Sequence, residues 1–432
     1  MILRDFRSIL GCFICKNDGM NNKSDICKRI INKIRIKYYE QYFKYYPNFV
    51  KKKIRNKEAI VVAFILYDLS TWKSENLYLS MLDHYRFSPI LAVTRNTNLA
   101  GNESKLIDYI ESKKYKYVIL NENQTINEQI HPDLIIYQRP YSEEPAKHRY
   151  YSNKKTLYVY VEYGVHGVLE SWGINRIVDN LAWQSYFENE LCAEGYRTKS
   201  RFKGRNIVVT GTPIMDDFSK PKELYTNPWK NNDTRKRIIW APHHTIGNIH
   251  SQGMAYGTFL SIADEMLSIA ETYKNHVYFA FKPHPQLYRN LVTLWGQSRT
   301  DAYYEKWKNM ENSQYESGEY MSLFKYSDAM IHDCCTFTVE YLAMGKPVMY
   351  VVRDEKRTDN IDECSRRSFE LHYHAYNAQD IRRFVENVID NIDPRKEERM
   401  EFVDEYLRPP HGKSACENIM NAILGVEEYK DC

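Results

Sequence analysis

Short apolar runs that alternate with helical stretches are the feature that most constrains the fold of this 432-residue chain. The first run, Ala59–Tyr67, is continuously apolar over the length of one strand, which is typical of a strand buried on both faces. A helical stretch follows at Ser74–Tyr85, and the alternation then continues along the chain. Strands that alternate with helices predict a parallel sheet in a doubly wound α/β domain.

The same scheme occurs twice. In the first half we expect further strands at 89–93, 117–120, 133–137 and 156–161, with a helix at 104–113. In the second half we expect strands at 237–241, 277–281, 329–332 and 347–352, with helices at 257–274 and 336–344. A polar, proline-containing segment without a strand pattern separates the halves, as expected of a domain boundary. The predicted parts are an N-terminal segment at 1–57, an α/β domain at 58–218, a linker at 219–235, and a second α/β domain with C-terminal helices at 236–432.

The N-terminal segment is strongly basic. Residues 1–57 hold 15 Lys and Arg against 4 Asp and Glu, whereas the rest of the chain holds 45 against 52. Between Lys28 and Lys57, isoleucines and tyrosines recur at helical spacing among the basic residues, so a basic amphipathic helix on an anionic membrane surface is the favoured prediction. A solvated helix packed on the body is the alternative. Nucleic acid is the weakest candidate because the body is acidic and carries no nucleic-acid-binding motif.

Composition and missing motifs exclude several classes. The sequence has no apolar run of 18 residues and no secretory signal pattern at its start, and its nine cysteines are irregularly spaced. These features predict a cytoplasmic protein, which the basic segment would hold against the inner face of a membrane. The sequence also lacks a GxxxxGK[ST] loop, a GxGxxG turn, a GxSxG elbow and an HExxH helix, which argues against kinases, ATPases, dehydrogenases, serine hydrolases and zinc proteases.

Candidate chemistry lies where strands end, because ligands of open parallel sheets collect at the carboxyl ends of the strands. The strand at 156–161 runs into His166, which is flanked by Gly164 and Gly167 and can accept a hydroxyl proton. His243 and His244 follow the first strand of the second half. Adjacent histidines can ligate a metal, but no acidic or cysteine partner stands at a recognisable spacing, so we expect no metal site.

Two further strand ends suit a diphosphate. Lys282 and His284 stand in a Lys-Pro-His-Pro turn that directs a cation and a titratable ring. The stretch from Asp333 to Thr336 passes from a strand into a helix, whose amide groups and Thr336 hydroxyl can receive phosphate, and Glu340 one turn later can reach ribose hydroxyls.

The order of these motifs resembles the CDP-glycerol glycerophosphotransferase family, the teichoic-acid and capsule polymer enzymes with a GT-B-like fold. The resemblance runs from about Ala59 to the C-terminus. It rests on six places: His166-Gly167, Val209–Asp216, Trp240-Ala241-Pro242, Lys282–Pro285, the block from Ser327 through Lys346-Pro347, and Gly412–Ala415. Three places depart from the family pattern, namely Cys335-Thr336, Val168-Leu169 and His243-His244-Thr245.

The resemblance implies two Rossmann-type domains facing a cleft and transfer of glycerol phosphate, or a similar alditol phosphate, from a CDP-activated donor to a hydroxyl acceptor, with release of CMP. The acceptor would be a lipid-linked or polysaccharide chain, and no cofactor is implied. It implies His166 and His284 as catalytic residues. It also implies a donor-binding set made of Gly211, Thr212, Pro242, His243, Lys282, Asp333, Cys335, Thr336 and Glu340.

Two alternatives stay open at this point. A GT-B glycosyltransferase that uses a nucleotide sugar shares the fold, and the UDP-sugar 2-epimerases resemble the junction around Gly211 too. A catalytically degenerate member that binds a nucleotide and assists capsule assembly is the other alternative, suggested by the Cys334-Cys335 departure.

Overall fold

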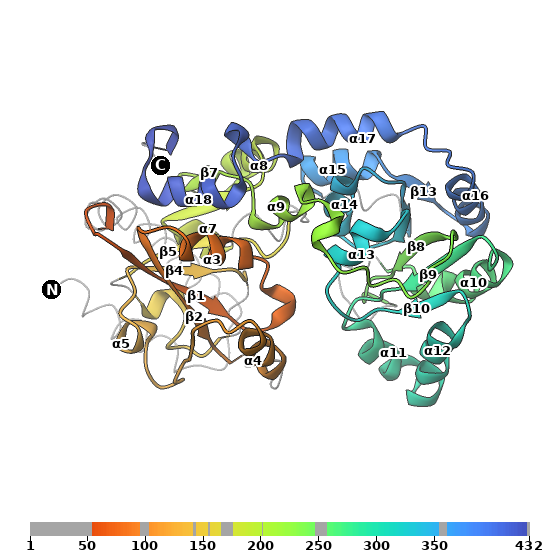
Figure 1. Cartoon of the computed structure of the whole chain (residues 1–432), viewed down its shortest axis with the longest axis horizontal. Coiled ribbons are helices and arrows are strands. Elements are labelled where there is room, and N and C mark those ends of the chain that lie inside the picture. Colours follow the sequence, from red (N-terminus) through yellow and green to blue (C-terminus); the bar gives the residue numbers. More distant parts are fainter. Residues whose placement is uncertain are drawn as a thin grey trace, which may run out of the picture. The chain divides into compact units, whose positions relative to one another are not determined.

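The computed structural model describes residues 54–95, 103–140, 144–153, 156–165, 176–200, 202–246, 257–353 and 361–429. The predicted basic segment lies outside these residues except for its last four positions. Within the described ranges the chain forms two parallel sheets, one in each half of the sequence, which Figure 1 shows in orange to yellow and in green to blue. The two α/β parts predicted from the alternating pattern are therefore confirmed.

The first sheet has the strand order β3-β2-β1-β4-β5-β6-β7, and its neighbouring strands are parallel. The strands are β1 Ile60–Leu66, β2 Phe87–Val93, β3 Tyr117–Ile119, β4 Leu134–Tyr137, β5 Leu157–Val161, β6 Gln184–Phe187 and β7 Ile207–Val209. The helices are α3 Glu75–Leu82, α4 Glu103–Ser112, α5 Ile126–Gln129, α7 Ile177–Leu181, α8 Glu190–Lys199 and α9 Pro213–Ser219. Single 3-10 turns lie at Leu69–Thr71, Tyr150–Ser152 and Lys222–Leu224.

The second sheet has the strand order β10-β9-β8-β11-β12-β13 and is also parallel. Its strands are β8 Lys236–Ala241, β9 Val277–Phe281, β10 Ser313–Tyr315, β11 Ala329–His332, β12 Val348–Val351 and β13 Tyr373–Ala375. The helices of this half are α10 Phe259–Thr272, α11 Leu287–Trp295, α12 Gln297–Asn309, α13 Met321–Tyr326, α14 Phe337–Glu340, α15 Glu363–Glu370, α16 Ala378–Ile389, α17 Lys396–Phe402 and α18 Ala415–Leu424. Further single turns lie at Leu342–Met344, Val403–Leu407, Pro410–Gly412 and Glu427–Tyr429.

Alternate residues of β8 show why its last four positions, Ile238 to Ala241, are all apolar. Ile238 and Trp240 pack with α10, α12 and α16, whereas Ile239 and Ala241 pack with α13, α14 and the segment around Phe402. Successive side chains of a strand point to opposite faces, so a strand covered on both faces needs apolar residues at every position. Trp240 is 1% exposed and lies against the rings of Phe259, Phe281 and Trp307.

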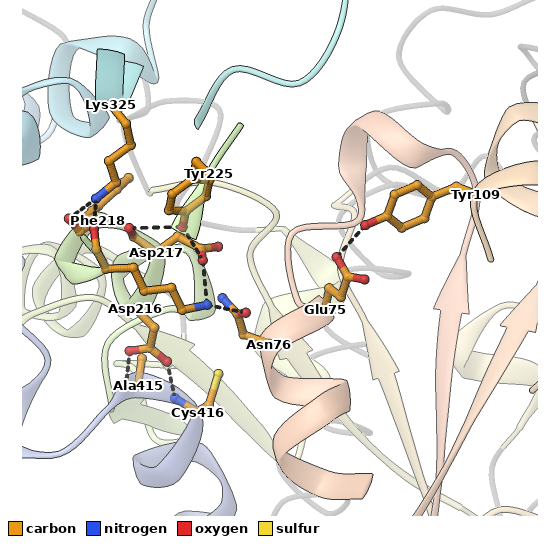
Figure 2. A network of polar contacts seen from close by, with 11 residues as sticks. Glu75, Asn76, Tyr109, Asp216, Asp217, Phe218, Tyr225, Lys325, Ala415 and Cys416 are labelled. Carbon is orange, nitrogen blue, oxygen red and sulfur yellow. Dashed lines mark hydrogen bonds and ion pairs between the residues drawn. The ribbon is translucent and has the colours of Figure 1, made fainter. Parts of the chain in front are cut away.

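The last helix, α18, comes after the second sheet in sequence but packs on elements of the first half. It contacts α3 and α9, and the Gln184 side chain of β6 donates to the Ala422 carbonyl. Both Asp216 carboxylate oxygens accept from the first amides of α18, those of Ala415 (2.7 Å) and Cys416 (3.0 Å), as Figure 2 shows. A carboxylate at a helix N-terminus satisfies amides that have no partner inside the helix.

The segment between the sheets is held from both sides. Lys220 donates to Asn76 of α3 (2.7 Å) and to Asp217 (2.9 Å), while Lys325 of α13 donates to the carbonyls of Phe218 and Lys220, both at 2.6 Å (Figure 2). Trp229 is buried within the core of the second half, and its indole N–H donates to the Leu323 carbonyl. These contacts connect the two halves through a strand-free but ordered segment.

No helix in the described part of the chain is long and apolar enough to cross a bilayer.

Candidate active site

The carboxyl ends of β8, β9 and β11 lie side by side because these strands are neighbours in the second sheet. The segments that follow them are residues 242–246, 282–286 and 333–336. They hold most of the predicted donor-binding residues, so the sheet order brings together motifs that lie up to 94 positions apart in sequence. Pro242 is buried, and its carbonyl accepts from the His284 amide at 2.9 Å, which joins the first two segments.

Asp333 joins the first and third segments. One carboxylate oxygen accepts from the His243 amide at 2.6 Å, and the other accepts from the Thr258 amide (2.5 Å) and hydroxyl (2.8 Å). The side chain is 1% exposed, and burial raises its pKa while these hydrogen bonds act in the opposite direction. Asp333 therefore positions the loop that carries His243, and its carboxylate is directed into the protein.

Three imidazole rings gather at this edge of the sheet. The ring centroids of His243 and His244 are 4.3 Å apart, those of His244 and His284 are 4.2 Å apart, and those of His243 and His284 are 5.2 Å apart. Burial, with smaller effects from His244 and Lys282, lowers the pKa of His284 to about 3. His284 is thus a neutral imidazole at physiological pH. The sequence predicted the two strand ends but not the contact between His244 and His284.

Lys282 lies beside these rings and is only 8% exposed. Its ammonium group donates to the Gly318 carbonyl at 2.7 Å, and burial lowers its pKa to about 8. Lys73 of the first half lies near enough to lower the pKa of Lys282 further, and its own ammonium stands 4.5 Å from the centre of the Tyr320 ring. Lys73 was missed by sequence reasoning, although it follows the carboxyl end of β1, because one lysine in a loop has no distinguishing pattern.

Glu340 faces the first sheet. One of its oxygens accepts from the Val165 amide, in the segment that follows β5, at 3.4 Å, and a Cβ on Gly164 would lie 3.1 Å from the same oxygen. The side chain is 1% exposed, and burial raises its pKa to about 7 against smaller lowering effects from Tyr320 and Lys73. The prediction that Glu340 reaches a ribose is untested, and in this structure the carboxylate contacts backbone.

The predicted helix at 336–344 is shorter than expected. Helix α14 spans only Phe337–Glu340 and gives way to a 3-10 turn at Leu342–Met344. Cys335 and Thr336 are half-buried at its start, whereas Cys334 is buried and its thiol contacts the Ala241 carbonyl. One helical turn has few aligned peptide dipoles, so the helix-end argument for phosphate binding is weaker than the sequence indicated.

Gly211 and Thr212 contact the C-terminal segment. Gly211 has a φ of +78°, and a Cβ there would lie 2.9 Å from Cβ of Ala415 and 3.0 Å from Cβ of Pro409. Thr212 is fully buried at the start of α9. Their surroundings give both residues a packing role at the junction with α18. His166, the predicted base, lies outside the described residues; the last described position before it is Val165.

The carboxyl edge of the first sheet holds buried ion pairs that sequence reasoning missed. Asp68, after β1, pairs with Arg139, after β4, at 3.0 Å. Glu162, after β5, pairs with Arg176 at 2.8 Å and also accepts from the Tyr160 hydroxyl at 2.9 Å. All four charged side chains of these pairs are less than 10% exposed. No local signal could have found the Asp68–Arg139 pair, since 71 positions separate its members.

Comparison with family models then decides the family. The model for CDP-glycerol:poly(glycerophosphate) glycerophosphotransferases matches residues 176–425, which include the whole second sheet and α18. The chain belongs to this family. It is therefore a transferase, and at the level of the glycerophosphotransferase family its reaction is a CDP-glycerol-type transfer from a nucleotide-activated donor. The resemblance seen in the sequence is confirmed.

Solved structures support the fold of this glycerophosphotransferase family member. The wall teichoic acid polymerase TagF has a TM-score of 0.56 at 13% identity, covering 96% of this chain and 99% of its own. The MnaA protein of S. aureus, solved with UDP, has a TM-score of 0.55 at 15% identity, covering 86% and 97%. A UDP-GlcNAc 2-epimerase from Methanocaldococcus jannaschii has a TM-score of 0.56 at 15% identity, covering 84% and 99%. A search of curated protein sequences gave no match. These likenesses confirm the predicted GT-B-like architecture.

Proposed function

We propose that the protein transfers glycerol phosphate, or a similar alditol phosphate, from a CDP-activated donor to a hydroxyl group of a growing surface polymer such as teichoic acid or capsule polysaccharide, with release of CMP. The observation that carries this proposal is the family match over residues 176–425. The TagF structure that was also solved after a soak with CDPG supports the donor class. The family description, which names poly(glycerophosphate), supports a polymer hydroxyl as the acceptor.

The donor diphosphate would lie at the carboxyl edge of the second sheet. There the imidazoles of His243 and His284, the buried ammonium of Lys282, and the half-buried Cys335 and Thr336 come from adjoining segments. Phosphoryl transfer needs positioning and charge stabilisation more than covalent help from the protein. Polar groups held in place by backbone contacts supply both, because they need little reorganisation during the reaction.

His284 would stabilise the leaving CMP. With a pKa lowered to about 3, the ring is neutral before the donor arrives and acts first as a hydrogen-bond partner of the diphosphate. A bound diphosphate places negative charge beside the ring and raises its pKa, which favours proton transfer to the departing phosphate. We expect His284→Ala to lower turnover by about 10²–10⁴-fold.

His166 would act as general base on the acceptor hydroxyl. It directly follows the Gly164-Val165 stretch, whose backbone reaches Glu340 beside the donor site. A base on one side and a diphosphate on the other suits an in-line displacement at the distal phosphorus. Turnover of His166→Ala should fall by about 10²–10⁴-fold, and near-wild-type turnover would remove His166 from this role.

The decisive experiment measures which nucleotide is released. Purified protein is incubated with CDP-glycerol, CDP-ribitol and UDP-sugars in the presence of lipid-linked or polysaccharide acceptors. We expect CMP from a CDP-alditol donor and no nucleoside diphosphate from the UDP-sugars. Release of UDP would instead indicate a glycosyltransferase. His276→Ala is a matched control for His284→Ala, because His276 is exposed at the opposite end of β9.

The basic segment would hold the enzyme at an anionic membrane where a lipid-linked acceptor lies. Removing residues 1–57 would also remove the buried Ile54 and the Lys57–Asp133 ion pair, so substitution is the cleaner test. Replacing Lys51, Lys52 and Lys53 with Gln should weaken sedimentation with phosphatidylglycerol vesicles, since each basic residue contributes about 1 kcal/mol at such a surface. The same change at the exposed Lys113, Lys114 and Lys116 is the control, and equal effects of the two triple variants would refute the proposal.

A further inference from the structure

The nitrogen atoms of three histidine side chains converge at the carboxyl edge of the second sheet. His243 and His244 follow β8 and His284 follows β9, and one ligand atom from each lies within 4.8 Å of the others. All three side chains are half-buried, so the cluster is open to a small ligand. Neutral imidazoles that converge from rigid segments are a common donor set for transition metals, and imidazole nitrogen suits zinc, copper, nickel and iron.

Backbone contacts hold the cluster in place in addition to the contacts of the imidazole rings. The His284 amide donates to the Pro242 carbonyl at 2.9 Å, and the Asn290 side chain donates to the His244 carbonyl at 2.9 Å. The Asp333 carboxylate holds the His243 amide at 2.6 Å. Both segments are therefore ordered by the fold itself, which reduces the ordering needed when an ion binds.

Charge at this edge of the sheet gives an independent argument. Among residues 242–246, 282–286 and 333–340, the only lysine or arginine is Lys282, whereas Asp333 and Glu340 are acidic. The Lys282 ammonium already donates to the Gly318 carbonyl. A diphosphate is doubly negative, so an ion bound among these segments would add positive charge to that of Lys282 and the nearby Lys73.

We propose that His243, His244 and His284 bind one divalent transition-metal ion, with zinc as the preferred ion, and that its remaining positions take oxygens of the donor diphosphate. The first part stands on the cluster alone, and the second rests on the proposed function. Three protein ligands with an open position are typical of catalytic zinc sites. The ion would supply positive charge where charge develops on the leaving phosphate. It would do so in place of a proton on His284, because a ring nitrogen that binds a metal cannot also carry the transferred proton.

The surroundings of the rings indicate how the ion is held. His243 Nδ1 lies 2.9 Å from the Thr245 hydroxyl, which accepts from the Gly257 amide, and it also accepts from the Thr245 amide at 3.4 Å. If Nδ1–H donates to the hydroxyl instead of accepting from this amide, Nε2 can bind the ion. The Gln286 amide donates to His284 Nδ1 at 3.1 Å, a contact that coordination through Nε2 would replace. The three nitrogens would close to roughly 3.4 Å from one another, the spacing of a tetrahedral site with metal–nitrogen distances of about 2.1 Å.

Cobalt(II) is the probe for this site because its visible absorption reports nitrogen ligands and coordination number. The full-length protein, made without a histidine tag, is stripped with EDTA and titrated with Co²⁺, and zinc content is measured separately by plasma mass spectrometry after dialysis. We expect one ion per chain, Co²⁺ bands of a four- or five-coordinate nitrogen site, and displacement of Co²⁺ by Zn²⁺. His244→Ala should weaken binding at least ~100-fold, because it removes a direct ligand. His276→Ala should bind like the wild type.

Three results would overturn the metal site: no Co²⁺ or Zn²⁺ bound, equal binding by wild type and His244→Ala, or an octahedral, oxygen-type spectrum. The nucleotide assay separates this proposal from the proposed function. Full CMP release in EDTA without metal binding would refute the metal site and still support the transfer reaction. Metal binding without CMP release from any CDP donor would refute the proposed transfer reaction and support the metal site. Addition of CDP to the Co²⁺ protein should alter the visible bands, and an unchanged spectrum would exclude diphosphate oxygens as ligands.

Discussion

The carboxyl edges of the two sheets differ in the charged groups that they hold and in how those charges are compensated. At the first sheet, Asp68 with Arg139 and Glu162 with Arg176 form buried ion pairs that neutralise each other inside the protein. At the second sheet, three imidazoles gather with the half-buried Cys335 and Thr336 and with Lys282, a buried lysine whose ammonium donates to a carbonyl. The buried Asp333 there is directed inward.

This difference indicates that the first edge serves mainly stability and the second mainly binding. A buried charge is costly unless a partner compensates it, so the pairs of the first edge are needed by the folded state even without a ligand. At the second edge, half-buried imidazoles lie where we propose that the donor binds. We therefore expect substitutions at the first edge to act mainly on stability and substitutions at the second to act mainly on binding and turnover.

The largest expected effect is loss of one member of a first-edge pair. Arg139→Ala leaves the Asp68 carboxylate buried without its ion-pair partner and should lower the free energy of unfolding by about 3–5 kcal/mol. Urea denaturation followed by circular dichroism measures it. Arg95→Ala is the matched control, since the Arg95–Glu122 pair is exposed and should contribute less than about 1 kcal/mol. Equal losses in the two variants would contradict the contrast between the edges.

A pH profile tests the contact that Glu340 makes with the first sheet. The folded state holds the Glu340 pKa at about 7 against an ordinary value of 4.5, so between these values it binds a proton that the unfolded state has released. Stability should therefore fall as pH rises from 4.5 to 7, by roughly 3 kcal/mol in total from this group. Urea midpoints across this range measure the fall.

Glu340→Gln is the control for that profile, because it keeps the side-chain oxygen but cannot titrate. The difference between the wild-type and variant profiles isolates the contribution of this one carboxyl group from the other groups that titrate. Parallel profiles from pH 4.5 to 7 would show that Glu340 is ionised normally and that its burial is not maintained in solution.

Two aspartates that flank β11 allow the two edges of the second sheet to be compared. Asp333, after β11, holds the His243 amide, while Asp328, before β11, accepts from the Arg237 amide at 2.7 Å at the opposite edge. Asp333→Asn and Asp328→Asn should each cost about 1–3 kcal/mol of stability. Only Asp333→Asn should also lower turnover, on the order of 10²-fold, because it displaces the histidine loop. CMP release per folded molecule distinguishes the two, and an equal loss of turnover in both variants would contradict a positioning role for Asp333.

The sequence predicted the long apolar strands well because burial on both faces leaves a continuous apolar run. It missed β6, β7, β10 and β13, which are three or four residues long, and β6 and β10 carry polar residues such as Gln184 and Gln314. Gln184 is buried but donates to a carbonyl of α18, a partner 238 positions away. Such a strand is stabilised by tertiary contacts that no local pattern records.

For the candidate site, the sequence predicted which strand ends come together but not where their side chains point. Parallel strands bring His243 and His284 to one edge, and this follows from strand order alone. The inward direction of Asp333, the turn of Glu340 toward Val165 and the packing of Gly211 on Pro409 depend on side-chain environment instead. No local pattern predicts any of these contacts, because in each case the partner lies at least 75 positions away in the sequence.

The smallest expected effect comes from a methyl group placed where the two halves touch. In Gly164→Ala the new Cβ would lie 3.1 Å from the Glu340 oxygen that accepts from the Val165 amide. That oxygen ends a rotatable side chain and can move away, so the cost should stay at about 1 kcal/mol or less, the low end for an overpacked site. Moving it weakens a hydrogen bond that lowers the Glu340 pKa, and the pH at which stability stops falling should therefore shift upward. Gly318→Ala, where a Cβ meets nothing within 4 Å, should leave that pH unchanged. If both alanine variants leave the profile where it is in the wild type, the contact between Glu340 and the strand end of the first sheet does not set the Glu340 pKa.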